Sequence, residues 1–290
     1  MNSMWSEKIM ISAPYDFDKG LNRLALDPLH SIRLEDRLIR VPIYCEQLEI
    51  AEVKAVGTVD DPAFIVTGAY DETKEEVLKQ VSTIFQWDTP LQAITAHFSK
   101  TSLKDIFTIH YGTPLILEFS LFSCLIKSII HQQLNTTFAH TLTNRFVHAF
   151  GYELDGVMFY PSPQDIIHLS VEELRELQFS QRKAEYIIDL AKAIVEDKLN
   201  LAALKYLPDE SVIKELVKFR GIGPWTAQNF LLFGLGRLNL FPKTDIGIQR
   251  AVKQLFRLEK KPNAKQMERY AKEWEPYLSY ASLYLWRSIE

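Results

Sequence analysis

The chain has 290 residues, of which 47% are hydrophobic, 24% charged and 12% aromatic, with a formal net charge of −4. This composition excludes a disordered, collagen-like or coiled-coil chain. No apolar run reaches the roughly 18 residues of a membrane span, and the first residues lack the apolar stretch of a signal peptide. The 2 cysteines are too few for a disulfide framework, a four-cysteine zinc site or an iron–sulfur cluster. We therefore expect a reduced, cytoplasmic and mostly helical protein.

The first ninety-odd residues have a mixed α and β pattern. Residues 6–12, 37–42, 48–56 and 63–67 are short β-branched or alternating segments bounded by Pro, Gly or Asp pairs, which predicts four strands. Residues 17–26 and 71–85 carry apolar side chains at helical spacing. The fold class predicted for residues 1–97 is α+β, built on an antiparallel sheet.

After residue 90 the pattern changes to one helix after another. Residues 119–130 are apolar nearly all round, which predicts a buried helix. Ser162-Pro163 and Ser170-Val171-Glu172-Glu173 are typical helix starts. Further helical patterns cover residues 136–150, 180–196, 209–219, 263–273 and 277–288. Residues 98–290 are therefore predicted to form an all-helical region.

Charge is distributed unevenly along this chain. Residues 1–98 hold 9 basic and 16 acidic residues, a net of −7. Between Lys214 and Lys272, 13 basic residues stand against 4 acidic ones, a net of +9. A basic block in an acidic chain is typical of a surface that binds a polyanion, although a solvated Lys-rich helix face gives the same pattern.

A glycine-containing turn joins two of the predicted helices. The first runs into Gly221-Ile222-Gly223, and the second begins at Pro224, a residue that suits a first helical position. Two glycines around one aliphatic residue permit a tight hairpin whose exposed N–H groups suit a phosphate oxygen. The same pattern also fits a plain helical hairpin with a glycine cap.

The hairpin and its surroundings resemble the helix-hairpin-helix superfamily of DNA repair glycosylases. The resemblance rests on residues 219–227, Phe-Arg-Gly-Ile-Gly-Pro-Trp-Thr-Ala, and on Asp245, which follows Gly223 by 22 residues. Within the superfamily the chain is most similar to bacterial DNA-3-methyladenine glycosylase II. Tyr15-Asp16-Phe17, residues 129–134 and residues 280–286 match motifs of that enzyme, and Arg220 stands where the superfamily has proline.

The resemblance implies a DNA glycosylase fold and a set of roles. The helical region would form two subdomains that flank a cleft, with the hairpin at about residues 212–234. Asp245 would be catalytic, stabilising positive charge on the sugar and activating water, although an aspartate at a helix start also serves as a plain cap. The base pocket would be lined by Trp225, Trp286, Tyr284, Asn229 and Ile246, and the gap in the DNA would be filled by Gln133, Leu134 and Gln132.

The resemblance also implies contacts with the DNA backbone. The residues expected at phosphates are Arg220, Gly221, Gly223, Thr226, Lys218, Lys243 and Arg250. A monovalent cation, Na⁺ or K⁺, would lie on the backbone carbonyls of Phe219 and Ile222, and no other cofactor is required. The partner implied is double-stranded DNA with alkylated bases, bound by a monomer in the cytoplasm, at the nucleoid of a bacterium.

The activity implied is excision of alkylated purines, 3-methyladenine and 7-methylguanine, without strand cleavage. Superfamily members that cut the strand use a lysine nucleophile at the position of Trp225. Two alternatives stay open: a non-catalytic DNA-binding protein that uses the hairpin as a clamp, and a glycosylase for oxidised or deaminated purines.

Overall fold

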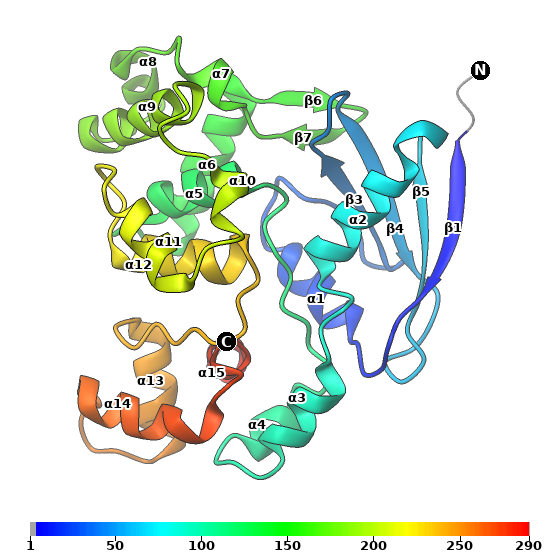
Figure 1. The fold of residues 1–290 in the computed structure, drawn as a ribbon, viewed down its shortest axis with the longest axis vertical. Coiled ribbons are helices and arrows are strands. Elements are labelled where there is room, and N and C mark those ends of the chain that lie inside the picture. The colour runs from blue at the N-terminus through cyan, green and yellow to red at the C-terminus, as the bar shows by residue number, and fades with distance from the viewer. Residues whose placement is uncertain (1–3, 290) are drawn as a thin grey trace.

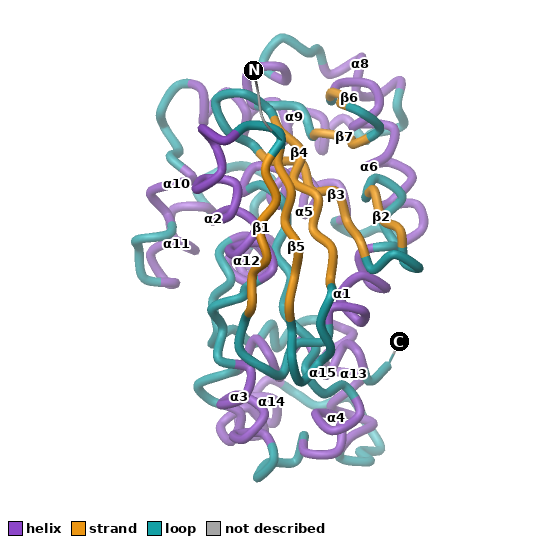
Figure 2. The backbone as a smooth tube through the Cα atoms, turned by 90° about the vertical axis from the view of Figure 1, so that its right-hand side faces the viewer, coloured by secondary structure: helices purple, strands orange, loops and turns teal. Residues whose placement is uncertain are grey.

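A five-stranded antiparallel sheet forms one side of the molecule (Figure 1). The computed structural model describes residues 4–289. The strand order is β1-β5-β4-β3-β2, so the first strand pairs with the last and residue Trp5 lies opposite Gly68. The strands are β1 (Trp5–Met10), β2 (Ser31–Arg33), β3 (Leu38–Ile43), β4 (Glu49–Ala55) and β5 (Ala63–Gly68). Figure 2 shows these strands side by side, with a face of the sheet turned toward the viewer.

An aromatic core packs against the sheet. Helix α1 (Phe17–Leu24) and helix α2 (Lys74–Phe85) supply Phe17 and Phe85 to it. Phe17 meets Phe64 of β5 edge-on with ring centroids 5.1 Å apart, and Phe64 stacks on Trp87 at 4.8 Å. Burial of large rings at a face of alternating residues is the main stabilisation of such a sheet.

The rest of the chain is mostly helical and forms two groups in Figure 1. One group surrounds α5, and the other joins α13, α14 and α15 with α3 and α4 beside them. The helices are α3 (Leu91–Phe98), α4 (Lys104–Ile109), α5 (Leu121–His131), α6 (Thr136–Phe150), α7 (Pro163–Ile166), α8 (Val171–Glu176), α9 (Gln181–Val195), α10 (Leu201–Leu204), α11 (Asp209–Leu216), α12 (Pro224–Asn229), α13 (Ile246–Leu255), α14 (Ala264–Ala271) and α15 (Leu278–Arg287). Single turns complete them: 3₁₀ at Asp71–Thr73 and Lys272–Trp274, and a π-helical turn at Phe230–Gly234.

The starts of α7 and α8 explain why helices form there. Ser162 and Ser170 each accept the backbone N–H three residues on, while Asp165 and Glu173 reach back to the cap N–H. These are capping boxes, as the sequence predicted. Helix α5 is buried along most of its length, also as predicted, with Lys127 as its charged exception.

The predicted α+β class is confirmed, with one correction. The helical region is not all-helical, because β6 (Tyr152–Leu154) and β7 (Val157–Phe159) form a hairpin that packs near β3. The predicted domain boundary after residue 97 falls inside α3. This helix packs on α4, and its His97 side chain lies 3.1 Å from the Glu273 carbonyl oxygen, within hydrogen-bond distance. We therefore propose that the sheet-containing unit ends before Leu91. Among residues 4–289, no helix has the length and apolar character needed to cross a bilayer.

Candidate catalytic and DNA-binding site

The turn between α11 and α12 uses its two glycines differently. Gly221 has φ +85, and a Cβ there would lie 2.3 Å from ring atoms of Tyr186 on α9. Gly223 caps α12 with φ −92 and ψ 177, and a Cβ there would meet nothing within 4 Å. The fold therefore requires glycine at position 221, whereas Gly223 borders open space in front of the N-terminus of α12.

The loop after α5 is fastened to this hairpin. The Gln132 side-chain amide donates to the Gly221 carbonyl at 2.7 Å and to the Thr226 hydroxyl at 2.8 Å. From α9, the Lys183 ammonium donates to the Ile130 and Gln132 carbonyls at 2.6 and 2.7 Å. Two elements that lie far apart in sequence are thus held as one unit.

Gln133 lies at the exposed tip of that loop, with φ +56. Leu134 is partly buried against the core, and Gln132 is committed to the hairpin. Of the three predicted gap-filling residues, Gln133 alone is exposed in the structure. Thr226 needs a correction, because its side chain is 1% exposed and bonds Gln132, so it links loop and hairpin instead of facing a phosphate.

Asp245 is the N-cap of α13, and one of its two carboxylate oxygens accepts the hydrogen bonds that hold the side chain in place. Its Oδ1 accepts the Ile248 amide at 2.9 Å and the Trp286 indole N–H at 2.9 Å. Its Oδ2 has no hydrogen-bond partner among residues 4–289. The aspartate is therefore both a cap and a fixed carboxylate with one oxygen left for another group, a position that the positive end of α13 favours for an anion.

Trp286 connects Asp245 to a cavity. Its ring stacks on Phe233 with centroids 5.9 Å apart, and Phe233 belongs to the π-helical turn and lines the cavity. Gly247 allows this arrangement, since a Cβ there would stand 3.1 Å from Asp245 Oδ1 and from Trp286 Cδ1. Neither Phe233 nor Gly247 belongs to a sequence pattern that predicts a site residue.

The cavity measures about 1240 Å³ and lies between α5, α6, α12, α15 and the segment that follows α1. Trp225 and Asn229 of α12 line it, as predicted for the base pocket. The other predicted pocket residues lie elsewhere. Trp286 stacks on Phe233 and does not itself line the cavity, and Ile246, which is 72% exposed, does not line it either. Tyr284 is 1% exposed in the core, stacked on Phe107 at 3.8 Å, with its hydroxyl donating to the Thr113 carbonyl.

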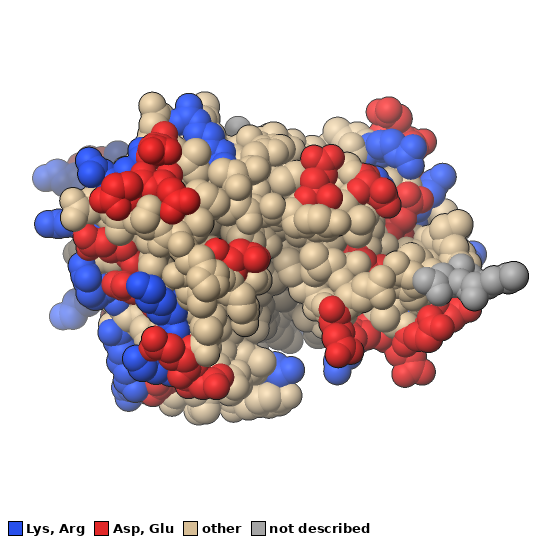
Figure 3. Space-filling view, turned by 90° about the horizontal axis from the view of Figure 1, so that it is seen from above, with Lys and Arg blue, Asp and Glu red and all other residues tan. Residues whose placement is uncertain are grey.

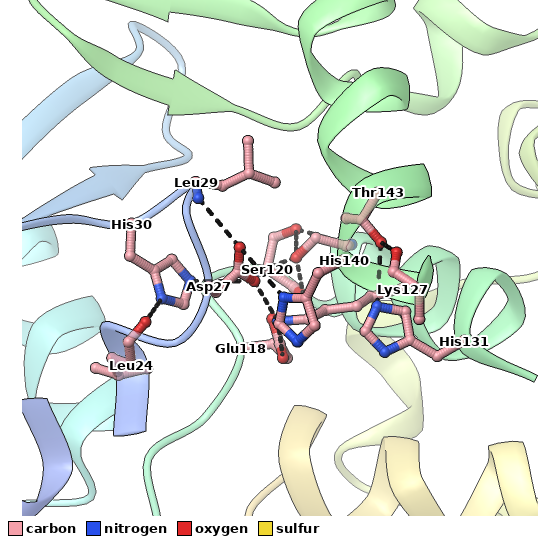
Figure 4. A network of polar contacts seen from close by, with 12 residues as sticks. Leu24, Asp27, Leu29, His30, Glu118, Ser120, Lys127, His131, His140 and Thr143 are labelled. Carbon is pink, nitrogen blue, oxygen red and sulfur yellow. Dashed lines mark hydrogen bonds and ion pairs between the residues drawn. The ribbon is translucent and has the colours of Figure 1, made fainter. Parts of the chain in front are cut away.

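One wall of the cavity carries a polar cluster that the sequence analysis missed (Figure 4). The Lys127 ammonium on α5 lies 2.9 Å from Asp27 and 2.9 Å from Glu118. Burial by itself lowers the pKa of Lys127, but Glu118, Tyr160 and Asp27 raise it more, and the ammonium stays protonated. Burial raises the pKa of Asp27, yet Lys127, His30 and two hydrogen bonds bring it down to about 2. In the sequence, a single lysine within a mostly apolar helix was the feature that could have indicated this cluster.

Two histidines complete the same wall. Burial, Lys127 and His140 lower the pKa of His131 to about 3, so its imidazole is neutral near pH 7. The Thr143 hydroxyl donates to the Ala139 carbonyl at 2.9 Å, so His131 Nε2 donates to Thr143 at 3.1 Å. The other ring nitrogen of His131 is consequently a hydrogen-bond acceptor.

Three of the four cations predicted at phosphates are already paired, and the fourth, Arg250, is exposed and has no ion pair within residues 4–289. Arg220 contacts Glu185 at 3.0 Å and Asp189 at 3.5 Å, and its guanidinium lies over Tyr186. Lys218 contacts Glu215 at 2.7 Å, and Lys243 contacts Glu268. Such exposed pairs stabilise a fold by only about 0–1 kcal/mol, so a phosphate can replace the carboxylate. Figure 3 shows Lys and Arg gathered at the left, over the helical region, while Asp and Glu predominate on the sheet side at the right.

Comparison with known proteins agrees with this geometry. Residues 126–276 match the family model described as the HhH-GPD superfamily of base excision DNA repair proteins. The chain is 54% identical over 289 residues, 99% of its length and 100% of the relative's, to a putative DNA-3-methyladenine glycosylase of Bacillus subtilis. The chain belongs to the HhH-GPD superfamily.

Two further superfamily members resemble the chain over most of its length. A DNA-3-methyladenine glycosylase 2 of Escherichia coli is 27% identical over 284 residues, which cover 94% of each chain. The solved structure of a 3-methyladenine DNA glycosylase from Archaeoglobus fulgidus superposes with a TM-score of 0.85 at 25% identity, covering 97% of both chains. The N-terminal sheet is therefore part of the shared architecture and not an addition to it.

The predicted cation site of this superfamily member stays a prediction. The Phe219 carbonyl accepts the Ile222 amide at 3.1 Å, which leaves it a second lone pair for a monovalent ion. Across residues 4–289, no group of three or more His, Cys, Asp or Glu side chains is arranged to hold a metal ion.

Proposed function

We propose that this protein is a monofunctional DNA glycosylase that removes alkylated purines, 3-methyladenine and 7-methylguanine, from duplex DNA. It acts as a monomer on chromosomal DNA in the cytoplasm, at the nucleoid. The proposal is supported by membership of the HhH-GPD superfamily and by the names of its relatives. The observation that carries it is Asp245, held through one oxygen by α13 and Trp286 with its other oxygen unused.

This carboxylate suits hydrolysis of a glycosidic bond. An alkylated purine is cationic and leaves readily, so the reaction needs a negative charge near C1′ as the sugar becomes oxocarbenium-like, together with a water. Asp245 Oδ2 supplies that charge and accepts the proton of the attacking water. Because Oδ1 is fixed by two hydrogen bonds, the carboxylate is already oriented before substrate arrives.

The surrounding elements suit a flipped nucleotide. The base must leave the duplex, and Gln133 is the exposed side chain on the loop that would fill its place. The cavity lined by Trp225 would receive the base, and an indole face attracts a cation by roughly 0.5–2 kcal/mol. Gly223 leaves open space beside backbone N–H groups, where a phosphate can approach.

Strand cleavage by a Schiff base needs a neutral amine, and the described site offers none. Trp225 stands at the position where lyases of the superfamily have lysine. The lysine that lines the cavity, Lys127, is kept protonated by two carboxylates. This arrangement supports hydrolysis that leaves an intact abasic strand.

The test is base release from dimethyl-sulfate-treated duplex DNA, with chromatography of the released bases and gel analysis of the strands. We expect the wild type to release 3-methyladenine and 7-methylguanine without strand scission. Asp245→Asn keeps a cap and should lose about 10²–10⁴-fold in rate while still binding DNA. Equal rates for the two proteins would remove Asp245 from catalysis, and DNA binding without any release by the wild type would favour a non-catalytic clamp.

A further inference from the structure

Glu118 is linked to the catalytic aspartate through a chain of contacts. Its backbone amide donates to the Phe233 carbonyl at 2.8 Å. Phe233 stacks on Trp286, and Trp286 holds Asp245. Both Phe233 and Glu118 line the cavity. A base that occupies this cavity therefore shares it with Phe233 and Glu118.

The Glu118 side chain is held in place by an ion pair, and it can still accept further hydrogen bonds. Its Oε1 accepts the Lys127 ammonium at 2.9 Å, and that ammonium is fixed in turn by Asp27 from the segment after α1. The Glu118 side chain is still 23% exposed, and no residue in the described part of the chain hydrogen-bonds its Oε2. Figure 4 shows Asp27 approaching from the α1 side and Lys127 from α5, with Glu118 beside both.

Fold stability alone does not account for this cluster. A buried ion pair loses so much solvation that apolar residues of similar size stabilise a protein equally well or better. A joint between the sheet-containing unit and α5 would need Asp27 and Lys127, but it would not need Glu118, which lies three residues before the start of α5. Glu118 therefore keeps hydrogen-bonding capacity for a ligand in the cavity that it lines.

Resting on the function proposed above, we infer that Glu118 reads the base: its two carboxylate oxygens accept a pair of adjacent N–H donors on the everted purine. Guanine-type bases present such a pair, the ring N1–H beside the 2-amino group. Adenine-type bases present one amino group beside an acceptor nitrogen. The acceptor nitrogen of His131 on the same wall adds to the preference for donors. The protein is accordingly specific for 7-methylguanine over 3-methyladenine.

Charge does not decide between these two lesions. Both are cationic in DNA, so the arginines that also line the cavity, Arg23, Arg145 and Arg287, affect them alike. A change in the ratio of the two excision rates between wild type and a variant therefore reports on hydrogen bonding, because the intrinsic labilities of the two lesions cancel in that comparison. Sites that are built to bond a substrate donor discriminate strongly against an analogue that lacks it, because their own polar groups are then left unpaired.

Glu118→Gln tests the inference by replacing an acceptor–acceptor pair with an acceptor–donor pair of the same shape. We expect the ratio of single-turnover rates, 7-methylguanine over 3-methyladenine, to fall about tenfold or more in this variant. Glu118→Asp keeps both acceptors and should preserve the order of preference. Glu52→Gln removes a carboxylate from the sheet surface instead and should leave the ratio unchanged.

A binding experiment separates this inference from the proposed function. Titration of the free bases 7-methylguanine and 3-methyladenine, followed by tryptophan fluorescence, reports on the cavity without excision. The wild type should bind 7-methylguanine more tightly, and Glu118→Gln should lose that preference. Absence of the preference in the wild type, or an unchanged ratio in a folded Glu118→Gln variant, would overturn the inference. If the preference is found but no base is released from DNA, the inference stands and the proposed activity fails.

Discussion

The two glycines of the hairpin should respond to the same substitution in opposite ways. In Gly221→Ala the new methyl group would stand 2.3 Å from the Tyr186 ring, and the residue would keep φ +85. A left-handed backbone costs a non-glycine residue about 1–2 kcal/mol, and forcing apart a packed contact costs about 1–3 kcal/mol more. We expect a loss of about 2–5 kcal/mol in the free energy of unfolding.

Gly223→Ala should leave the fold almost unchanged. The residue has φ −92, and its Cβ would point into space that is empty to 4 Å. Alanine is a poorer cap than glycine, but it also reduces the entropy of the unfolded chain, so the net change should stay within about 0.5 kcal/mol. The methyl group would instead obstruct a phosphate at the start of α12. Loss of one charge-assisted N–H contact, about 1.5–3 kcal/mol, weakens DNA binding roughly tenfold to a hundredfold.

Urea unfolding gives the stabilities, and fluorescence anisotropy with a duplex that carries an abasic analogue gives the affinities at a fixed salt concentration. The reasoning would be refuted by a Gly223→Ala variant that binds this duplex as tightly as the wild type. It would equally fail if Gly221→Ala unfolded with wild-type stability, because the contact with Tyr186 would then not constrain the turn.

Three further perturbations follow from contacts around the site. Lys183→Met removes the ammonium that holds the loop after α5, so base release should slow about tenfold. The control Lys192→Met, at an exposed position on the same helix, should leave the rate unchanged. Equal rates for the two variants would contradict the role of Lys183 as an anchor of the loop. Trp286→Phe keeps a ring but removes the donor to Asp245, so kcat should fall about tenfold with little change in KM, and a change in KM alone would argue against a positioning role. The pKa of His131 is about 3 in the folded protein, below its ordinary value of about 6.5, so protonation favours the unfolded chain. The free energy of unfolding should therefore fall by up to about 1.4 kcal/mol per pH unit as the pH is lowered from 6 to 4. In His131→Gln this contribution to the slope of unfolding free energy against pH should vanish, and a slope identical to the wild type would show that the imidazole titrates normally.

Local patterns in the sequence determined the elements and the hairpin. Alternating β-branched segments, serine caps and apolar helix faces act over a few residues, which is why four of the five sheet strands and most helices after residue 119 were predicted. Gly221, Pro224 and Asp245 were readable for the same reason, since a turn glycine, a first-turn proline and a capping aspartate are local features. The short strand Ser31–Arg33, the hairpin β6–β7 and the helices α3 and α4 carried patterns too short to predict.

Tertiary structure decided which side chains share the site. Trp225 and Tyr284 are both aromatic and both match the family, yet packing put one at the cavity wall and the other in the core. Asp27, Glu118 and Lys127 meet only because the segment after α1 folds against α5, a contact between residues 100 apart in the chain. Composition and residue spacing do not predict contacts of this kind, because the burial and ion pairing of a side chain depend on how whole helices and strands pack together.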